Sequence, residues 1–110
     1  MLKTILGVIA LTTTCALAHA QPAADQRPGF TLKQLGPGIY GAINPDGGRA
    51  GSNAGFIVGD DAVAVVDTLV DVAPARELLA EIRKVTDKPI KFVVNTHYHL
   101  DHTGGQCGIR

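Results

Sequence analysis

Residues 90–105 read IKFVVNTHYHLDHTGG, an apolar run followed by a cluster of histidines and a pair of glycines. The run Ile90–Val94 predicts a buried strand, because short apolar segments rich in β-branched residues are typical of strands. Four potential metal ligands follow it within six positions: His97, His99, Asp101 and His102. Zinc prefers imidazole and carboxylate ligands, and active-site loops often lie at strand ends. The sequence therefore favours a metal site over a polar loop whose histidines only cap a strand.

The spacing of these ligands indicates how they share metal ions. Side chains alternate along an extended chain, so His97 and His99 lie on one side, with Cα atoms about 7 Å apart, and can bind one ion. Asp101 continues this alternation and His102 breaks it, so a turn at this point would direct both toward a second ion. The intervening residues are expected to face the other way and pack: Tyr98 and Leu100.

Four short segments upstream predict strands: residues 30–35, where apolar and polar side chains alternate, and the more apolar residues 39–43, 54–58 and 62–66. The last of them is apolar on both faces, so we expect it to lie in a sheet that is covered on both sides. Residues 44–53 are rich in glycine and predict a loop. This loop is either an ordinary connection or a flexible flap over the metal site.

A helix is predicted between the last two strands. Asp71 can cap its start, Pro74 is tolerated in its first turn, and Thr86–Pro89 ends it. An apolar stripe at helical spacing is expected to face the sheet: Leu78, Leu79, Ile82 and Val85. The order of strands, helix and strand predicts an α/β fold in which a helix packs on a sheet.

The N-terminal residues predict a cleaved secretory signal at positions 1–20. A positive charge at Lys3 and an apolar stretch over residues 5–17 precede the small residues of Ala18-His19-Ala20. The apolar stretch is shorter than the roughly 20 residues that a membrane-spanning helix needs. We therefore expect a secreted or periplasmic protein without a stable membrane span after cleavage.

The rest of the chain has the composition of one small globular domain. A polar linker at residues 21–29 leads into a folded part at residues 30–110. Over the whole chain, ten Lys and Arg residues balance ten Asp and Glu residues, so no basic surface indicates a nucleic-acid partner. Cleavage of the signal would leave Cys107 as the single cysteine, which excludes an intramolecular disulfide.

The stretch Asn95–Gly105 resembles the HxHxDH motif and flanks of the metallo-β-lactamase superfamily. Residues 52–58 (SNAGFIV) and 65–68 (VVDT) also resemble the early hairpin of that family, and the resemblance extends over roughly residues 30 to 105. It implies an αββα sandwich with a zinc site between two sheets. This α/β chain would supply the N-terminal half of the sandwich.

The resemblance also implies roles for individual residues. His97 and His99 would bind a first zinc ion, and Asp101 and His102 a second, with iron as the metal in some family members. Asp101 would also orient the attacking hydroxide, as a catalytic residue. Asp67 matches a position that supports the metal-binding loop from behind, although a carboxylate that only caps a strand end is equally compatible with the sequence.

These roles imply a zinc-dependent hydrolase, in which a metal-activated hydroxide attacks an ester, lactone, thioester or amide of a small-molecule substrate. The family's remaining ligands, two histidines and an aspartate, come well downstream of the motif, whereas this chain ends eight residues after His102. We therefore expect the N-terminal portion of such a domain, truncated after the motif. The alternative is a non-catalytic zinc-binding fragment that associates with itself through an uncovered sheet, so the sequence leaves open whether the chain is an enzyme.

Overall fold

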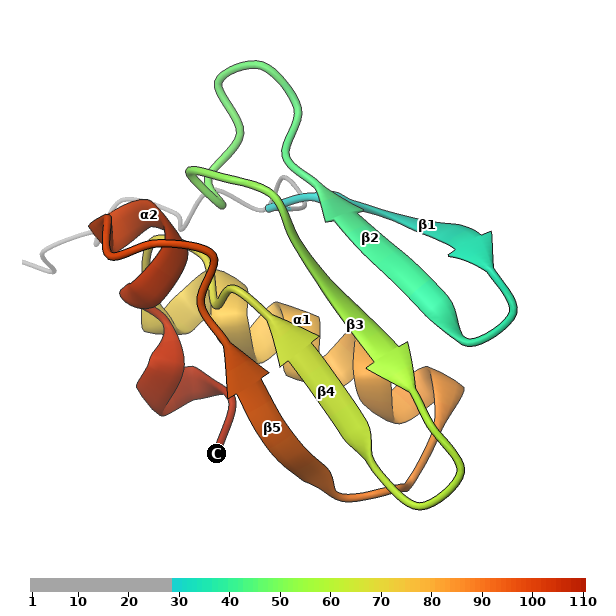
Figure 1. Cartoon of the computed structure of the whole chain (residues 1–110). Coiled ribbons are helices and arrows are strands. Elements are labelled where there is room, and N and C mark those ends of the chain that lie inside the picture. Colours follow the sequence, from blue (N-terminus) through green and yellow to red (C-terminus); the bar gives the residue numbers. More distant parts are fainter. Residues whose placement is uncertain (1–28) are drawn as a thin grey trace, which may run out of the picture.

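The computed structural model describes residues 29–110, which form one five-stranded mixed sheet with helices at its face and end (Figure 1). The strands are β1 (Thr31–Gly36), β2 (Ile39–Ile43), β3 (Ala54–Val58), β4 (Val63–Val66) and β5 (Ile90–Val94). They lie side by side in sequence order, antiparallel except for the parallel pair β4 and β5. The helices are α1 (Val72–Val85), α2 (Leu100–Thr103) and the short 3-10 helix η1 (Gln106–Gly108).

All of the predicted strands are present, with small shifts at their ends. β1 begins at Thr31 rather than one residue earlier, and β4 begins at Val63. The turn between β1 and β2 contains Gly38, which adopts a φ of 71°. An added Cβ at Gly38 would lie 2.9 Å from the carbonyl oxygen of Val58, so this turn requires glycine where it meets the end of β3.

The helix α1 connects the parallel strands β4 and β5 and covers one face of the sheet (Figure 1). Asp71 caps its N-terminus as expected, because its side chain accepts a hydrogen bond from the N–H of Val72 at 2.6 Å. The buried stripe includes the predicted Leu78 and Ile82 but begins earlier, at Pro74 and Ala75. The assignment of Val85 to the buried stripe is wrong, because that side chain is 39% exposed. The N-terminal half of α1 packs on η1 as well as on the sheet, which shifts burial toward the start of the helix.

Replacement of Asp71 by alanine removes the side-chain hydrogen bond at the start of α1. We expect Asp71→Ala to lower the free energy of unfolding by about 1 kcal/mol. Urea unfolding followed by circular dichroism measures the difference. The matched control is Asp87→Ala, which removes an exposed carboxylate just beyond α1 and should change the free energy by less than about 0.5 kcal/mol. Equal losses in both variants would show that the cap makes no contribution.

The hydrophobic core lies between α1 and the sheet. Phe56 of β3 is its largest fully buried side chain and stacks on Tyr40 of β2, with ring centroids 4.6 Å apart. The other buried apolar residues come from both layers and the adjoining loops: Phe30, Ala42, Ala50, Val63, Val65, Leu69, Ala75, Leu78, Ile82 and Ile109. The sheet and helix therefore form a two-layer unit that holds the ends of β4 and β5 in place.

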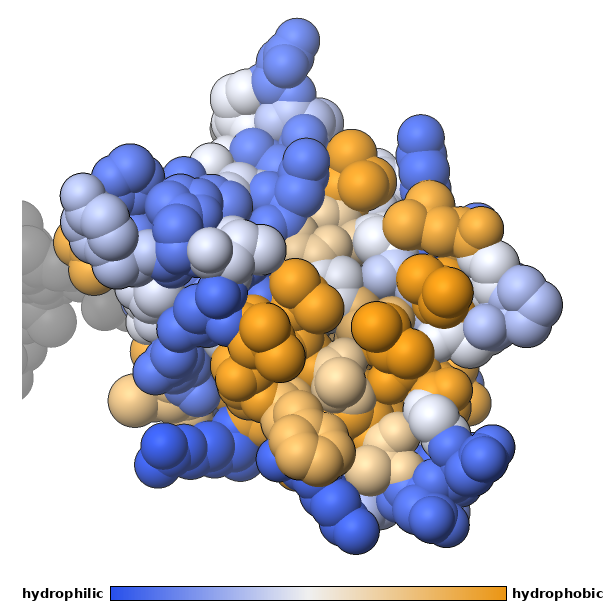
Figure 2. Space-filling model, viewed as in Figure 1, coloured by the Kyte–Doolittle hydropathy of each residue, from blue (hydrophilic) through white to orange (hydrophobic). Residues whose placement is uncertain are grey.

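The opposite face of the sheet is apolar and exposed. Figure 2 shows it as a continuous hydrophobic area over the strands, and its large side chains are Leu35, Ile39, Ile57, Phe92 and Val94. The prediction that residues 62–66 lie in a sheet covered on both sides is wrong for residues 29–110, because α1 covers one face alone. Val63 and Val65 face α1 and are buried, whereas the residues that alternate with them are partly exposed.

The strand β5 is also more exposed than its apolar sequence predicts. Val93 is 44% exposed and Phe92 is 60% exposed. β5 is an edge strand that pairs with β4 on one side. Its expected burial is therefore wrong for the described part of the chain, although its position and length are as predicted.

The predicted signal at residues 1–20 and the predicted linker, except for Gly29, lie outside the described residues. Gly29 is buried beside α1, where its N–H donates a hydrogen bond to Oε2 of Glu77 at 3.1 Å. Its carbonyl oxygen accepts a hydrogen bond from the N–H of Ala50 at 3.3 Å. Among residues 29–110, no helix combines the length and apolar character that crossing a membrane requires.

Candidate metal centre

The candidate site lies at the end of the sheet where the parallel strands β4 and β5 terminate (Figure 1). β4 leads into Asp67, and β5 leads into the histidine loop and then α2. Neighbouring parallel strands end at the same edge of a sheet, which is where α/β proteins commonly bind their ligands. This topology brings Asp67 within hydrogen-bonding distance of Thr96, 29 positions away in the sequence.

Three of the four predicted ligands form a compact group: His97, Asp101 and His102. One ligand atom from each residue lies within 4.8 Å of the other two. Tetrahedral zinc, with bonds of about 2.1 Å, places its ligand atoms about 3.4 Å apart, so small side-chain movements would fit these atoms around one ion. Two imidazoles and a carboxylate are also a donor set that proteins use for such ions. The residues of this group therefore fit a bound metal ion.

His99 is the predicted ligand that the structure leaves outside the group. Its carbonyl oxygen accepts hydrogen bonds from the N–H groups of His102 and Thr103, at 3.0 and 3.1 Å, so its backbone begins α2. Its imidazole lies edge-on to that of His97, with ring centroids 4.8 Å apart. His99 is thus adjacent to the group, and its role as a ligand stays a prediction.

The local conformation of the loop differs from the extended chain that the spacing predicts. The chain becomes helical at Leu100, so Asp101 and His102 project from one helical turn instead of continuing an alternation. Tyr98 and Leu100 are exposed, at 84% and 76%, and the expectation that they pack is wrong. The Tyr98 ring contacts the imidazole of His99 edge-on, with centroids 4.7 Å apart, but most of its surface remains exposed.

Asp67 supports the group from behind. It is buried, at 3% exposure, and accepts hydrogen bonds from the Thr96 N–H at 2.8 Å and the Thr96 hydroxyl at 2.7 Å. The same carboxylate lies 2.7 Å from Nδ1 of His102. A proton on Nδ1 leaves Nε2 of His102 free to bind a metal ion, which is the usual arrangement behind a metal-binding histidine.

The surroundings of Asp67 keep its carboxyl group ionised. Burial acts to raise its pKa. The hydrogen bonds from the Thr96 N–H, from His102 and from the Thr96 hydroxyl, together with the electrostatic interaction with His102, outweigh burial and hold the pKa below its ordinary value of 3.8. An ionised carboxylate at this place strengthens the hydrogen bond that orients the imidazole of His102.

Two further residues of the site were not predicted from the sequence. The hydroxyl of Thr96 lies 3.0 Å from Nδ1 of His97 and so connects this histidine to Asp67. The hydroxyl of Ser52 donates a hydrogen bond to the carbonyl oxygen of Asp101. Thr96 directly precedes the first histidine of the motif, so the sequence could have indicated that it lies in the site. Ser52 is 49 positions from its partner, and no sequence pattern connects the two.

The glycine-rich loop between β2 and β3 is held close to the site by its second half. Ala50 is buried, and its carbonyl oxygen accepts a hydrogen bond from the N–H of Val70 at 3.0 Å. Gly51 adopts a φ of 77°, and an added Cβ there would lie 2.7 Å from the Cβ of Val70. These contacts favour an ordinary, anchored connection over a flexible flap in this half of the loop.

The backbone of α2 is attached directly to the chain that follows β4. The N–H and the hydroxyl of Thr68 both donate hydrogen bonds to the carbonyl oxygen of His102, at 2.8 and 3.2 Å. The N–H of Gly105 donates to the carbonyl oxygen of Leu69 at 3.2 Å. An added Cβ at Gly105 would lie 2.6 Å from the Cβ of Ala75, so the glycine allows close approach of backbone segments.

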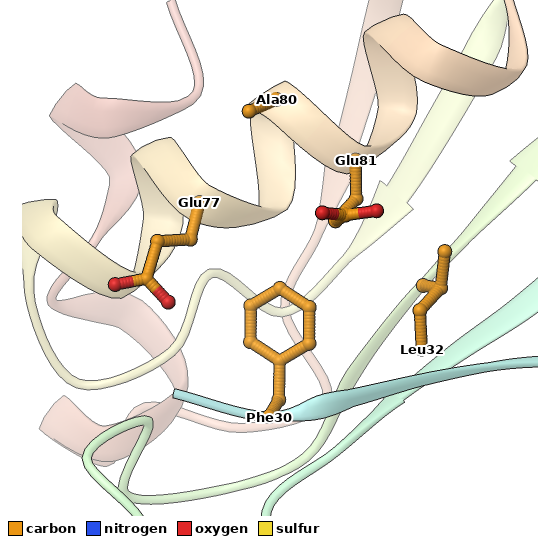
Figure 3. Close-up of a pocket in the computed structure, with 5 residues that line it drawn as sticks. All are labelled: Phe30, Leu32, Glu77, Ala80 and Glu81. Atoms are coloured by element: carbon orange, nitrogen blue, oxygen red, sulfur yellow. The ribbon is translucent and has the colours of Figure 1, made fainter. Parts of the chain in front are cut away.

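A separate pocket of about 300 Å³ lies between α1 and the start of β1 (Figure 3). Glu77 and Glu81 of α1 line it together with Phe30 and Leu32. Glu77 already forms an ion pair with Arg49 at 2.8 Å. None of the described histidines lines this pocket, so it does not belong to the candidate metal centre.

Comparison with known proteins places the site in a family. Residues 47–105 match the family model described as the metallo-beta-lactamase superfamily, which is more than half of the 110 residues. The chain therefore belongs to the metallo-β-lactamase superfamily. The matched region contains Asp67 and all four predicted ligands.

Individual relatives agree with this assignment. The linear primary-alkylsulfatase of a Pseudomonas species is 47% identical over 50 residues, which are 46% of this chain and 10% of the relative. The solved structure of the sec-alkylsulfatase Pisa1 from Pseudomonas sp. has a TM-score of 0.64 and 33% identity, covering 74% of this chain and 12% of that one. A metallo-β-lactamase from Hirschia baltica has a TM-score of 0.58 and 28% identity, covering 73% of this chain and 38% of that one.

These likenesses confirm that the described residues are an α/β part of the metallo-β-lactamase fold. The chain spans about a tenth of the length of the curated alkylsulfatase and no more than 38% of the solved structures named above.

Proposed function

We propose that the chain is part of a zinc-dependent hydrolase, with a metal centre formed by His97, Asp101 and His102. The observation that carries this proposal is the convergence of their ligand atoms within 4.8 Å, beside the buried carboxylate of Asp67. Two imidazoles and a carboxylate are ligands that zinc commonly takes, although iron can use the same set. His99, next to the group, is proposed as a further ligand.

The chemistry of the proposed centre divides between the ion and the chain. Bound zinc would supply Lewis acidity and lower the pKa of a water molecule to about 7. His97 and His102 would hold the ion through ring nitrogens, and Asp67 would fix the orientation of His102. The side chain of Asp101 is 42% exposed, so it can orient a water molecule and accept a proton from it.

Alkyl sulfate esters are the substrate class that we propose for the first test. Two relatives, both from Pseudomonas, are alkylsulfatases, and one of them is the linear primary-alkylsulfatase. An alkyl sulfate is also a small-molecule ester, the kind of substrate that a metal-activated hydroxide is expected to attack. Lactones and β-lactams serve as comparison substrates, because a metallo-β-lactamase is among the structural neighbours.

The test is release of inorganic sulfate from a linear alkyl sulfate by the zinc-loaded chain, measured by ion chromatography. Asp101→Asn is expected to lower the rate at least about 100-fold, because it removes the proposed base. Asp60→Asn, an exposed change in the turn between β3 and β4, is the control and should keep the rate. Sulfate release that survives both Asp101→Asn and a zinc chelator would contradict the proposal.

A second candidate is a non-catalytic metal-binding chain that associates with itself through the uncovered sheet. The exposure of Leu35, Phe92 and Val94 on one apolar face favours this candidate (Figure 2). Analytical ultracentrifugation of the zinc-loaded chain, beside the hydrolysis assay, measures whether the chain associates with itself. A self-associating chain without hydrolysis of any tested ester supports the second candidate.

We also propose that residues 1–20 direct secretion to the periplasm or the medium. The support is the order of a positive start, an apolar stretch and small residues at the N-terminus. Mass spectrometry of the protein recovered from the periplasm would find Gln21 as its first residue. Recovery of the intact chain in the cytoplasm would contradict this proposal.

A further inference from the structure

The hydroxyl group of Thr96 stands between two side chains of the candidate site. Its oxygen lies 2.7 Å from Oδ2 of Asp67 and 3.0 Å from Nδ1 of His97. The backbone N–H of Thr96 also donates to Oδ1 of Asp67 at 2.8 Å, which fixes the threonine against the carboxylate. Thr96 itself lies outside the group of potential metal ligands.

The direction of these hydrogen bonds follows from the number of protons available. A threonine hydroxyl has one proton to donate, and an ionised carboxylate can only accept. The proton of Thr96 is therefore used in the bond to Asp67, and its oxygen accepts from the second neighbour. That neighbour is Nδ1 of His97, which must then carry the proton of the neutral imidazole.

We propose that Thr96 is a positioning residue that fixes His97 in the tautomer with its proton on Nδ1 and its Nε2 lone pair free for the metal ion. Which nitrogen of a histidine is free is set by the hydrogen bond that the other nitrogen makes. Asp67 sets the free nitrogen of His102 directly, and the Thr96 hydroxyl connects the same carboxylate to His97. One buried aspartate thereby sets the tautomer of both imidazoles. This role of Thr96 rests on the proposed function, because it takes His97 to be a metal ligand.

The first test is the tautomer of His97 in the metal-free chain, read from nitrogen-15 NMR shifts of the imidazole at a pH where histidine is neutral. We expect the proton on Nδ1 in the wild type and in Thr96→Ser, which keeps the hydroxyl. In Thr96→Val, which keeps the shape and removes the hydroxyl, a large part of the population should move to the tautomer with the proton on Nε2. His102 is the internal control, because its tautomer is set by Asp67 and should not change.

The second readout is the zinc affinity of the same variants, measured by competition with a chromophoric chelator. Thr96→Val is expected to lower the affinity about 10-fold or more, and Thr96→Ser should restore it. Thr103→Val removes a hydroxyl that bonds to the carbonyl oxygen of His99, not to a ring nitrogen, so both readouts should stay at the wild-type level.

The two ways of failing are distinguishable. A proton on Nε2 of His97 in the wild type, or the wild-type tautomer in a folded Thr96→Val, overturns the inference about Thr96. If Thr96→Val does not fold, the wild-type spectrum alone decides. A wild type with the expected tautomer but without zinc binding supports the hydrogen-bond network and instead contradicts the proposed metal-dependent function.

Discussion

The Asp67→Ala variant should lose both stability and metal affinity. The substitution removes the acceptor of three hydrogen bonds, from the N–H and hydroxyl of Thr96 and from His102. We expect the free energy of unfolding to fall by about 3 kcal/mol, because hydrogen bonds to an ionised acceptor are lost at a buried place. Zinc affinity should fall about 10- to 100-fold, because His102 loses the group that orients it.

Urea unfolding of the metal-free chain and zinc competition measure the two effects of Asp67→Ala separately. The control is Asp60→Ala, which removes an exposed carboxylate at the other end of the sheet and should leave both quantities close to the wild type. The pair of measurements also separates the two roles that the sequence left open for Asp67. A loss of stability with unchanged zinc affinity would mean that Asp67 only caps the end of β4.

The second large effect is expected for Gly105→Ala. A Cβ at this position would overlap the carbonyl oxygen of Thr68 and would lie 2.6 Å from the Cβ of Ala75 and 2.7 Å from the carbonyl oxygen of Asp71. These neighbours lie in the segment between β4 and α1 and in the first turn of α1, so they cannot move independently. We expect a loss of at least about 3 kcal/mol, the upper end of the usual cost of overpacking.

Thermal unfolding of Gly105→Ala beside Gly36→Ala tests this expectation. Gly36 lies at the end of β1, where an added Cβ would meet the Cδ1 of Ile39 at 3.9 Å, an ordinary contact. Gly36→Ala should therefore unfold near the wild-type temperature. Equal stability of the two variants would show that the attachment of α2 and η1 to α1 is not as close as described.

The local elements of the fold could be predicted because their signals lie in adjacent residues. The cap at Asp71, Pro74 in the first turn and the apolar residues of α1 are all within one short segment, and the helix forms there. The strands follow apolar or alternating segments bounded by residues typical of turns (glycine, proline, asparagine or aspartate), so their positions could also be predicted. Burial was not, because the sequence of β5 does not say which layers cover Phe92 and Val94.

The candidate ligands could be predicted because they are contiguous in the sequence, whereas the position of Asp67 behind them was implied by the family resemblance alone. Asp101 and His102 belong to the motif itself, and so the group of ligands was identified. The helical turn that begins at Leu100 is joined by backbone hydrogen bonds to the segment that follows β4, and an alternation rule cannot reveal it. The bond from His102 to Asp67 joins residues 35 positions apart, and the sequence alone supplied no geometry for it.

The uncovered sheet face matters for any experiment on this chain. Apolar side chains such as Phe92 and Leu35 stand on it, and exposed apolar faces promote association. Metal and activity measurements therefore need a parallel determination of molecular mass in solution. The metal affinities of two variants can be compared only when their molecular masses in solution agree.

Zinc content and affinity of the full chain, measured beside the double variant His97→Ala, His102→Ala, decide whether these residues form a metal centre. We expect about one tightly bound zinc ion per chain in the wild type and its loss in the double variant, which removes two of the three converging ligands. Inductively coupled plasma mass spectrometry after gel filtration gives the stoichiometry. Wild-type zinc no higher than that of the folded double variant would contradict the claim that these residues form a metal centre.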